Sequence, residues 1–392
     1  MVQQAAPSGL KTSIGIDATN LRLGGGVTHL RELLGALKPV DLGINTIHVW
    51  GGSQTLAQLP ERPWLFKINP PALNSGLWQR ILWQTFSLAK AVRAAGCDVL
   101  FVPGGSYVAH FSPVVTMSQN LLPFEWSEIK RNGWSLRTVK MLALRWVQSY
   151  SFRRSEGVIF LSEYAKKAVW RVTGPLIGKC EIIPHGLSPL FSGLKSRSSA
   201  KKEYSKQDPY RLIYVSNIEA YKHQAEVIEA VFTLRQKGYP LALQLIGPSI
   251  PSGIDLLEKS MKKFDPKGAW VEYLGLIAYE DLRAHYENAD IAIFASSCET
   301  FGIILLEKMA IGLPIACSQL SGLPDLLGEA GLYFDPTKVV DIVKVLERYL
   351  ASPELRAQKG ELGRLRAQEY SWNKCAQTTF TFLCSIANSK AD

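Results

Sequence analysis

A short segment late in the chain carries the residue types with the clearest chemistry. Glu299 precedes, and Glu307 lies inside, a helix that the apolar pattern predicts to begin at about Gly302. The backbone N–H groups of Ile303 and Ile304 would then be unpaired donors at the positive end of this helix, a favourable position for a phosphate. Neither carboxylate can hold a phosphate, so both are expected to accept hydrogen bonds from hydroxyl groups, most simply those of a sugar. The alternative is one glutamate that caps the helix and another that is merely exposed.

The elements that must position these residues alternate between strand and helix. Short buried runs predict strands, and apolar residues spaced by three and four predict helices. In the first half the expected strands are Ser13–Asp17, Ile44–Trp50, Asp98–Val102, Val114–Met117, Gly157–Leu161 and Glu181–Pro184, and the expected helices are Val27–Leu37, Ser75–Ala95 and Ser162–Val172. In the second half the strands are Arg211–Ser216, Leu241–Ile246, Val271–Leu274, Ile291–Phe294 and Pro314–Cys317, and the helices are Glu226–Lys237, Ile254–Lys263, Tyr279–Asn288, Gly302–Ile311 and Val339–Ala351. This alternation predicts an α/β fold with a doubly wound parallel sheet in each half.

Length and composition indicate two domains. A chain of 392 residues is too long for one ordinary domain, and 47% apolar with 20% charged residues is typical of a folded globular protein rather than a disordered or fibrous one. Residues 192–209 contain almost no apolar side chains and are interpreted as a linker. We therefore expect one domain over residues 1–195 and a second over residues 196–371.

Several other classes of protein are disfavoured. The longest uncharged stretch, Val99–Phe124, contains three prolines and two adjacent glycines, which would break a membrane-spanning helix. The first dozen residues lack the apolar run of a secretory signal, so a cytoplasmic location is expected. The six cysteines include no Cys-x-x-Cys pair, which favours reduced core thiols over structural zinc.

The net charge of +10 is concentrated in residues 126–171, which hold ten Lys or Arg against three Glu. Aromatic residues, including Trp126, Trp146 and Trp170, are interleaved with these basic residues. One interpretation is a basic helix that lies on an anionic membrane surface. The other is a solvated basic face whose aromatic residues belong to the core. Nucleic-acid binding is not expected, because no helix-turn-helix, zinc or RRM-like signature accompanies the charge.

The spacing Glu299-x7-Glu307 is one of several ordered motifs. It is followed by Lys308-Met-Ala-Ile-Gly312-Leu-Pro314, by Gly322-Leu-Pro324-Asp325 and by Ala330-Gly-Leu-Tyr-Phe-Asp335-Pro336. Leu161-Ser-Glu-Tyr-Ala-Lys166, Ile183-Pro-His185-Gly186 and Tyr370-Ser-Trp372 add motifs at the expected domain ends. Together they resemble the retaining glycosyltransferases of family 4, over nearly the whole chain. The resemblance implies the GT-B fold: two Rossmann-like domains that face a cleft, and a C-terminal helix over residues 372–392 that returns to the N-terminal domain.

The resemblance also implies roles for individual residues of a nucleotide-sugar site in the second domain. Glu307 would bind the ribose hydroxyls, and Glu299 the hydroxyls of the transferred sugar. The main chain of Phe301 and Gly302 would hold the same sugar. Lys222 occupies the position of the family's diphosphate-binding lysine, where its charge would stabilise the departing nucleoside diphosphate. Without that resemblance Lys222 would be interpreted as a surface lysine.

Further positions follow from the same resemblance. The segment Val271–Gly275 resembles the strand before the base-binding loop, in which Leu276 comes next. Gly25 and Gly26 resemble an N-terminal loop whose lack of Cβ atoms lets the backbone approach diphosphate and acceptor. A glycine triplet alone is more often a flexible turn.

The sequence departs from the family pattern at two places. Asn217 stands where the family commonly has a diphosphate-binding arginine, and Gln119 stands where it frequently has a histidine on the acceptor side. His110 and His185 are the remaining acceptor-side candidates. No Asp-x-Asp motif is present, so we expect no metal and no cofactor, and the helix N-terminus and Lys222 would neutralise the diphosphate instead.

The function implied is transfer of a hexose, with retention, from a GDP- or UDP-linked sugar to a growing, lipid-linked glycan of a surface polysaccharide. Mannose from GDP-mannose is the first expectation. The alternatives are a nucleotide-sugar hydrolase or epimerase of the same fold, and a non-catalytic nucleotide-sugar-binding scaffold of a polysaccharide assembly complex.

Overall fold

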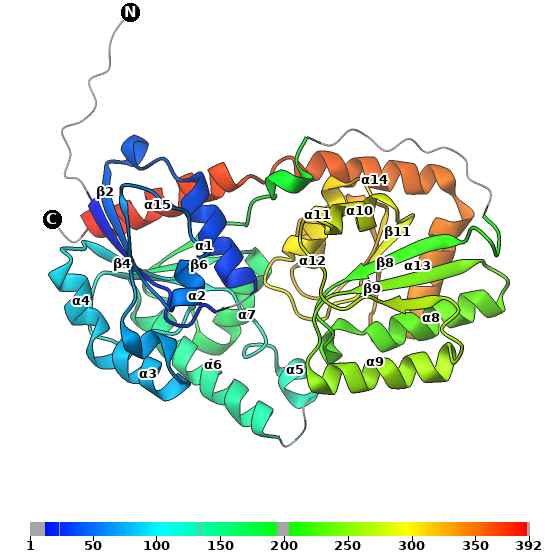
Figure 1. Ribbon diagram of the computed structural model, residues 1–392, viewed down its shortest axis with the longest axis horizontal. Helices are drawn as coiled ribbons and strands as arrows, with labels where there is room; N and C mark the ends of the chain where they lie inside the picture. The colour runs from blue at the N-terminus through cyan, green and yellow to red at the C-terminus, as the bar shows by residue number, and fades with distance from the viewer. Residues whose placement is uncertain (1–11, 23, 132, 134, 194–203, 390–392) are drawn as a thin grey trace, which may run out of the picture. The chain divides into compact units, whose positions relative to one another are not determined.

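The computed structural model describes residues 12–22, 24–131, 133, 135–193 and 204–389. The chain divides into two compact units, each of which contains one sheet (Figure 1). Unit 1 comprises the chain up to His185 together with the chain from Trp372 onward, and unit 2 comprises Gly186–Ser371. The boundary expected at residue 195 lies outside the described residues. The division falls earlier because Phe191 is already buried against Tyr279 and Tyr286 of unit 2.

Unit 1 is built on a seven-stranded sheet in the order β3-β2-β1-β4-β5-β6-β7, and every pairing is parallel. Its strands are β1 (Thr12–Asp17), β2 (Ile44–Trp50), β3 (Leu65–Ile68), β4 (Val99–Val102), β5 (Val114–Ser118), β6 (Gly157–Phe160) and β7 (Lys179–Ile182). Its helices are α1 (Gly25–Ala36), α2 (Ser53–Leu56), α3 (Leu77–Phe86), α4 (Leu88–Ala94), α5 (Trp126–Arg131), α6 (Leu136–Arg154), α7 (Glu163–Thr173) and α15 (Trp372–Asn388).

Unit 2 repeats this architecture with six parallel strands in the order β10-β9-β8-β11-β12-β13. The strands are β8 (Tyr210–Val215), β9 (Leu241–Ile246), β10 (Val271–Tyr273), β11 (Ile291–Phe294), β12 (Ile315–Ser318) and β13 (Gly331–Phe334). The helices are α8 (Gln224–Gln236), α9 (Pro251–Phe264), α10 (Leu282–Glu287), α11 (Ile303–Ala310), α12 (Leu323–Leu327), α13 (Val339–Ala351) and α14 (Pro353–Ala367).

The strand sequences explain why both sheets lie between helical layers. β4, β6, β11 and β12 are four-residue runs in which every residue is buried, as expected for parallel strands covered on both faces. In each unit the strand order reverses beside the first strand, between β1 and β4 and between β8 and β11. Loops at the carboxyl ends of such neighbouring strands are where doubly wound sheets bind ligands.

The expected doubly wound sheets are confirmed, with one correction among the helices. The helix expected over Ser75–Ala95 is divided at Ser87 into α3 and α4. The division lets α4 bury Leu88, Ala89 and Val92 in the core of unit 1, whereas most of α3 remains at the surface.

The C-terminal helix belongs to unit 1, as expected. α15 packs against α1 and β4 and buries one face along its length, including Trp372, Phe380 and Leu383 (Figure 1). Among the described residues, no helix has the length and hydropathy needed to cross a bilayer.

Candidate active site

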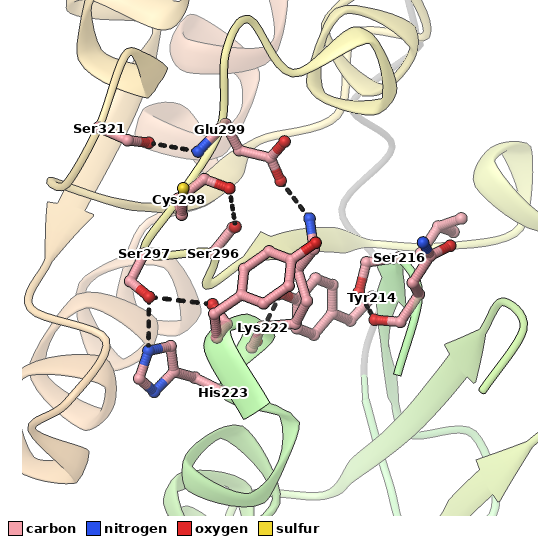
Figure 2. A network of polar contacts seen from close by, with 12 residues as sticks. Tyr214, Ser216, Lys222, His223, Ser296, Ser297, Cys298, Glu299 and Ser321 are labelled. Atoms are coloured by element: carbon pink, nitrogen blue, oxygen red, sulfur yellow. Dashed lines mark hydrogen bonds and ion pairs between the residues drawn. The ribbon is translucent and has the colours of Figure 1, made fainter. Parts of the chain in front are cut away.

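Two loops of unit 2 bring Lys222 and Glu299 together. Lys222 follows β8, and Glu299 follows β11, which pairs directly with β8. Their side chains form an ion pair at the carboxyl end of the sheet, with only 7% and 17% of the side-chain surface exposed (Figure 2). Residues 77 positions apart therefore make one site because their strands are neighbours.

A hydrogen-bond network fixes the two loops to each other. The Tyr214 hydroxyl donates to the Lys222 carbonyl oxygen at 2.6 Å. The backbone N–H of Ser297 donates to the Tyr221 carbonyl at 2.9 Å, and Ser297 Oγ lies 3.1 Å from His223 Nε2. The backbone N–H of Glu299 donates to Ser321 Oγ at 3.2 Å (Figure 2). The lysine and the glutamate are thus held by a rigid set of contacts rather than by mobile surface loops.

The environment of Lys222 keeps its ammonium group charged. Burial alone would lower the pKa of this lysine, but the Glu299 carboxylate and the Tyr214 hydroxyl raise it above its ordinary value. The Nζ atom also lies 4.8 Å from the Tyr221 ring centroid and 5.7 Å from that of Phe294. A permanent, mostly buried positive charge therefore stands at the strand ends.

Helix α11 begins immediately after this ion pair. Gly302 precedes the helix with a φ of +95°, a left-handed conformation that favours glycine, and a Cβ atom there would lie 3.0 Å from Leu323 Cδ2. Ile303 and Ile304 are the first two helical residues, so their N–H groups have no partner within the helix. Phe301 is buried, with its ring centroid 5.7 Å from that of Tyr370. The helix start predicted at about Gly302 is therefore present beside Lys222 and Glu299.

Glu307 lies inside α11, as the sequence predicted. It is buried, and it accepts hydrogen bonds from the hydroxyls of Tyr279 at 2.7 Å and Tyr286 at 3.4 Å. Burial raises the pKa of this carboxyl to about 7, against the opposing effect of these bonds and of Lys308. The carboxylate is thus positioned to accept hydroxyl hydrogen bonds, although two tyrosines occupy it in this structure.

Lys308 is a further ionisable group that the sequence analysis missed. Its side chain is completely buried, and Nζ donates to the Val215 carbonyl at 3.3 Å and lies 4.4 Å from the Phe294 ring centroid. Burial lowers the pKa of this lysine to about 7. The available signal was a lysine next to Glu307 in the otherwise apolar segment Leu305–Ile311, and such a charged pair elsewhere would mark an exposed helix face.

The other positions predicted in unit 2 lie at the same edge of the sheet. Leu276 follows β10 and is exposed. Asn217, at the position of the missing arginine, follows β8, and its carbonyl accepts a hydrogen bond from Gln224 Nε2 at 2.9 Å. Among the residues with described positions, no group of three or more His, Cys, Asp or Glu is arranged to bind a metal ion.

In unit 1 the structure brings Gly26 and Gln119 together. Gly26 lies in the first turn of α1, where a Cβ atom would lie 2.9 Å from Leu21 Cδ2 and 3.3 Å from Gln119 Oε1. Gln119 directly follows β5, so both are at the carboxyl edge of this sheet. Gly25, the first residue of α1, has open space around it. These three predicted positions form one group.

The two candidate histidines of unit 1 lie elsewhere. His185 is buried, its Nδ1 atom 3.0 Å from His29 Nδ1, and both rings are tilted against Trp372. Burial lowers the pKa of His185 well below its ordinary value, so the ring is neutral at pH 7. His110 is exposed in the loop before β5, and its carbonyl accepts a hydrogen bond from Arg93. The structure does not bring either side chain to Gln119 through any described contact.

The arrangement in unit 2 suits an anionic ligand that also carries hydroxyl groups. Lys222 and the start of α11 are positive, whereas Glu299 and Glu307 accept hydrogen bonds. A sugar linked to a diphosphate has both chemistries.

Parts of the chain are similar to known proteins. Residues 196–366 match the family model described as "Glycosyl transferases group 1". The chain is 28% identical over 233 residues to O-antigen chain mannosyltransferase B of Escherichia coli, which covers 58% of this chain and 57% of that protein. It is 27% identical over 247 residues to a GDP-mannose-dependent α-(1-6)-phosphatidylinositol monomannoside mannosyltransferase of Mycolicibacterium smegmatis. This match covers 59% of this chain and 62% of that protein. The chain thus spans a little over half the length of these two relatives.

The fold comparison extends over both units. Sucrose-phosphate synthase from Thermosynechococcus elongatus superposes with a TM-score of 0.75 and 18% identity, covering 96% of this chain and all of that one. Two parallel Rossmann-like sheets, the returning C-terminal helix and this superposition show the GT-B fold. Over residues 196–366, within which Glu299 and Glu307 lie, the chain matches the group 1 glycosyltransferases.

Proposed function

We propose that this protein transfers a hexose, with retention and without a metal ion, from a nucleotide sugar to a growing glycan. The observation that carries the proposal is the buried Lys222–Glu299 ion pair beside the N-terminus of α11. A donor that enters would replace this pair: the diphosphate would take the ammonium group of Lys222 and the N–H groups of Ile303 and Ile304. Glu299 would then accept hydrogen bonds from the sugar.

The other residues of the donor site take the roles that their positions allow. The main chain of Phe301 and Gly302 would contact the hexose, and Glu307 would accept hydrogen bonds from ribose hydroxyls after exchange with Tyr279. Leu276, exposed at the end of β10, would contact the base. Gly25 and Gly26, beside Gln119, would admit the diphosphate and the acceptor close to the backbone.

Charge stabilisation is the chemical contribution of this site. As the bond from the sugar to the phosphate oxygen breaks, negative charge grows on the diphosphate, and Lys222 with the α11 N-terminus would stabilise it. In a same-face displacement the leaving phosphate oxygen takes the proton of the acceptor hydroxyl. The protein then needs no basic side chain at the acceptor, which is consistent with Gln119 in place of a histidine.

For the donor we propose GDP-mannose. The support is the activity for which two relatives are named, one an O-antigen chain mannosyltransferase and the other GDP-mannose-dependent. For the acceptor we propose a lipid-linked oligosaccharide of a surface polysaccharide, modified at the inner face of the cytoplasmic membrane. The phosphatidylinositol-linked acceptor in the second relative's name supports a lipid-bearing substrate.

The basic residues of 126–171 support contact with an anionic membrane. Trp134, within this range, lies outside the described residues. Lys130, Arg131 and Lys140 are exposed, and α6 carries five basic residues and no acidic one. Charge neutralisation of Lys130, Arg131, Arg137 and Lys140 that left both activity and vesicle binding unchanged would contradict this contact.

The transfer reaction is tested by product analysis with GDP-mannose and a lipid-linked glycan acceptor. We expect a retained glycosidic linkage, and a loss of at least about a hundredfold in Glu299→Ala because the sugar loses its carboxylate partner. Glu258→Ala, which removes an exposed glutamate of α9, is the matched control and should transfer normally. Release of free mannose without acceptor at the same rate would instead identify a hydrolase.

A further inference from the structure

Two helices of unit 1 turn several large apolar side chains toward the exterior. In α3 the buried residue is Gln84, whereas Leu77, Trp78, Leu82 and Phe86 are exposed. The exposed fraction reaches 77% at Trp78. Surface helices of globular proteins normally turn their apolar side toward the core. The outward side of α3 is therefore suited to apolar surroundings rather than to water.

Helix α6 also exposes apolar residues while it buries polar ones. Its buried residues are Gln148, Ser149 and Ser151 together with Met141 and Phe152. Exposed apolar residues recur on the opposite side of the helix at intervals of three and four: Leu136, Val139, Leu142, Trp146 and Tyr150. Leu136 is 89% exposed, and the rings of Trp146 and Tyr150 are stacked at 6.0 Å.

One loop joins α3 and α6 into a single surface. Gln84 Nε2 of α3 donates to the Ser106 carbonyl at 3.1 Å, and the next residue, Tyr107, donates its N–H to Ser151 Oγ of α6 at 2.7 Å. This loop leaves the carboxyl end of β4, and Gln84 also donates a hydrogen bond to Asp17 at the end of β1. Both helices thus flank the same sheet edge as Gly26 and Gln119, and their exposed apolar residues lie on the sides turned away from this loop.

The positive charge of the neighbouring helices indicates which kind of partner suits this surface. The segments α3, α4 and α6 carry Arg80, Lys90, Arg93 and the five basic residues of α6, and no acidic residue. A second copy of the chain would place like charges opposite each other, which opposes association. An anionic bilayer offers both the apolar interior and the complementary charge.

We propose that the outward sides of α3 and α6 insert into the headgroup region of an anionic bilayer, so that unit 1 is held by apolar insertion and not by charge alone. The inference rests on the proposed function in one respect. A lipid-linked acceptor held in this bilayer would lie near the sheet edge that carries Gly26 and Gln119. The inference also extends the contact to α3, which lies outside the basic segment 126–171.

The test is flotation with vesicles of phosphatidylethanolamine and phosphatidylglycerol, at low salt and at about 1 M salt, where the Debye length is only about 3 Å. We expect binding that persists at high salt. The double variants Trp78→Ser/Phe86→Ser and Leu136→Ser/Trp146→Ser should each reduce high-salt partitioning by about tenfold or more. Because these side chains are exposed, both variants should fold normally.

The matched control is Val40→Ser/Ile177→Ser. It also removes two exposed apolar side chains of unit 1, but from the connections that precede β2 and β7, at the opposite edge of the sheet. This control should bind vesicles as the unmodified protein does. Complete release of the unmodified protein at high salt, or equal loss in the control, would overturn the proposal. Loss of a dimer in the α3 variant, measured by sedimentation, would overturn it in favour of a second copy.

GDP binding by the same variants separates this inference from the proposed function. Vesicle binding without nucleotide binding would refute the transferase and leave the inserted surface standing. Nucleotide binding without salt-resistant vesicle binding would refute the inserted surface and leave the proposed transferase standing.

Discussion

Glu307 and Lys308 are adjacent ionisable residues that α11 buries, and their shifted pKa values link stability to pH. Burial raises the pKa of Glu307 from 4.5 to about 7, so between these values the folded protein holds more protons than the unfolded chain. The free energy of unfolding then falls as the pH rises through this range. Burial lowers the pKa of Lys308 from 10.5 to about 7, so above about pH 7 the folded protein holds fewer protons and this contribution rises with pH.

We therefore predict that substitution of Glu307 removes the fall in stability with pH, and that substitution of Lys308 removes the rise. Relative to the unmodified protein, Glu307→Gln should remove a decrease in stability between about pH 4.5 and 7, and Lys308→Met an increase between about pH 7 and 10.5. Either slope is at most about 1.4 kcal/mol per pH unit. Urea unfolding across this pH range measures both. Parallel stability curves for variant and unmodified protein would show that the group titrates as it does in water.

The sequence predicted some of these side chains and not others for a physical reason. The family resemblance pointed to Glu299, Glu307 and Lys222, but the ion pair between Lys222 and Glu299 depends on the pairing of β8 with β11. Lys308 was missed because a periodic pattern assigns every lysine to the surface, whereas here a carbonyl and an aromatic ring receive its ammonium group.

The turn into α11 depends on Gly302, which has both a left-handed backbone and a close neighbour. We predict that Gly302→Ala destabilises unit 2 by about 1–2 kcal/mol through the backbone conformation, with a further loss from contact with Leu323. Gly238→Ala is a closely matched control, because Gly238 has a φ of +94° and nothing within 4 Å of the added Cβ. Urea unfolding of the two variants measures the difference. Equal destabilisation would mean that the close approach to Leu323 has no cost.

Among the elements, the sequence predicted those whose apolar pattern is strong. Both sheets follow from alternating buried runs and helices, but α14 was missed. Its buried residues are Gly360, Gly363 and Ala367, and a Cβ on Gly360 would lie 2.2 Å from the Gly312 carbonyl oxygen. A helix that packs through small residues in this way shows no apolar stripe.

Each of the two units is a doubly wound sheet, and the carboxyl ends of the strands hold Lys222 and Glu299 in unit 2 and Gln119 beside Gly26 in unit 1, whereas His110 and His185 lie elsewhere. The return of α15 to unit 1 was predicted from the motif at Trp372, whereas the apolar outer sides of α3 and α6 were not. Periodicity shows that a helix has an apolar side. Only the packed structure shows whether that side faces the core or the exterior.

We propose that unit 2 binds a nucleoside diphosphate, and calorimetric titration with GDP, UDP and ADP measures this binding directly. We predict selective binding of one nucleotide, GDP first. Binding should weaken by about tenfold or more in Lys222→Met, which loses the buried charge, and should weaken in Glu307→Ala. Lys237→Met, which removes an exposed lysine paired with Glu347, should bind normally. A folded protein that binds none of the three nucleotides would contradict the account.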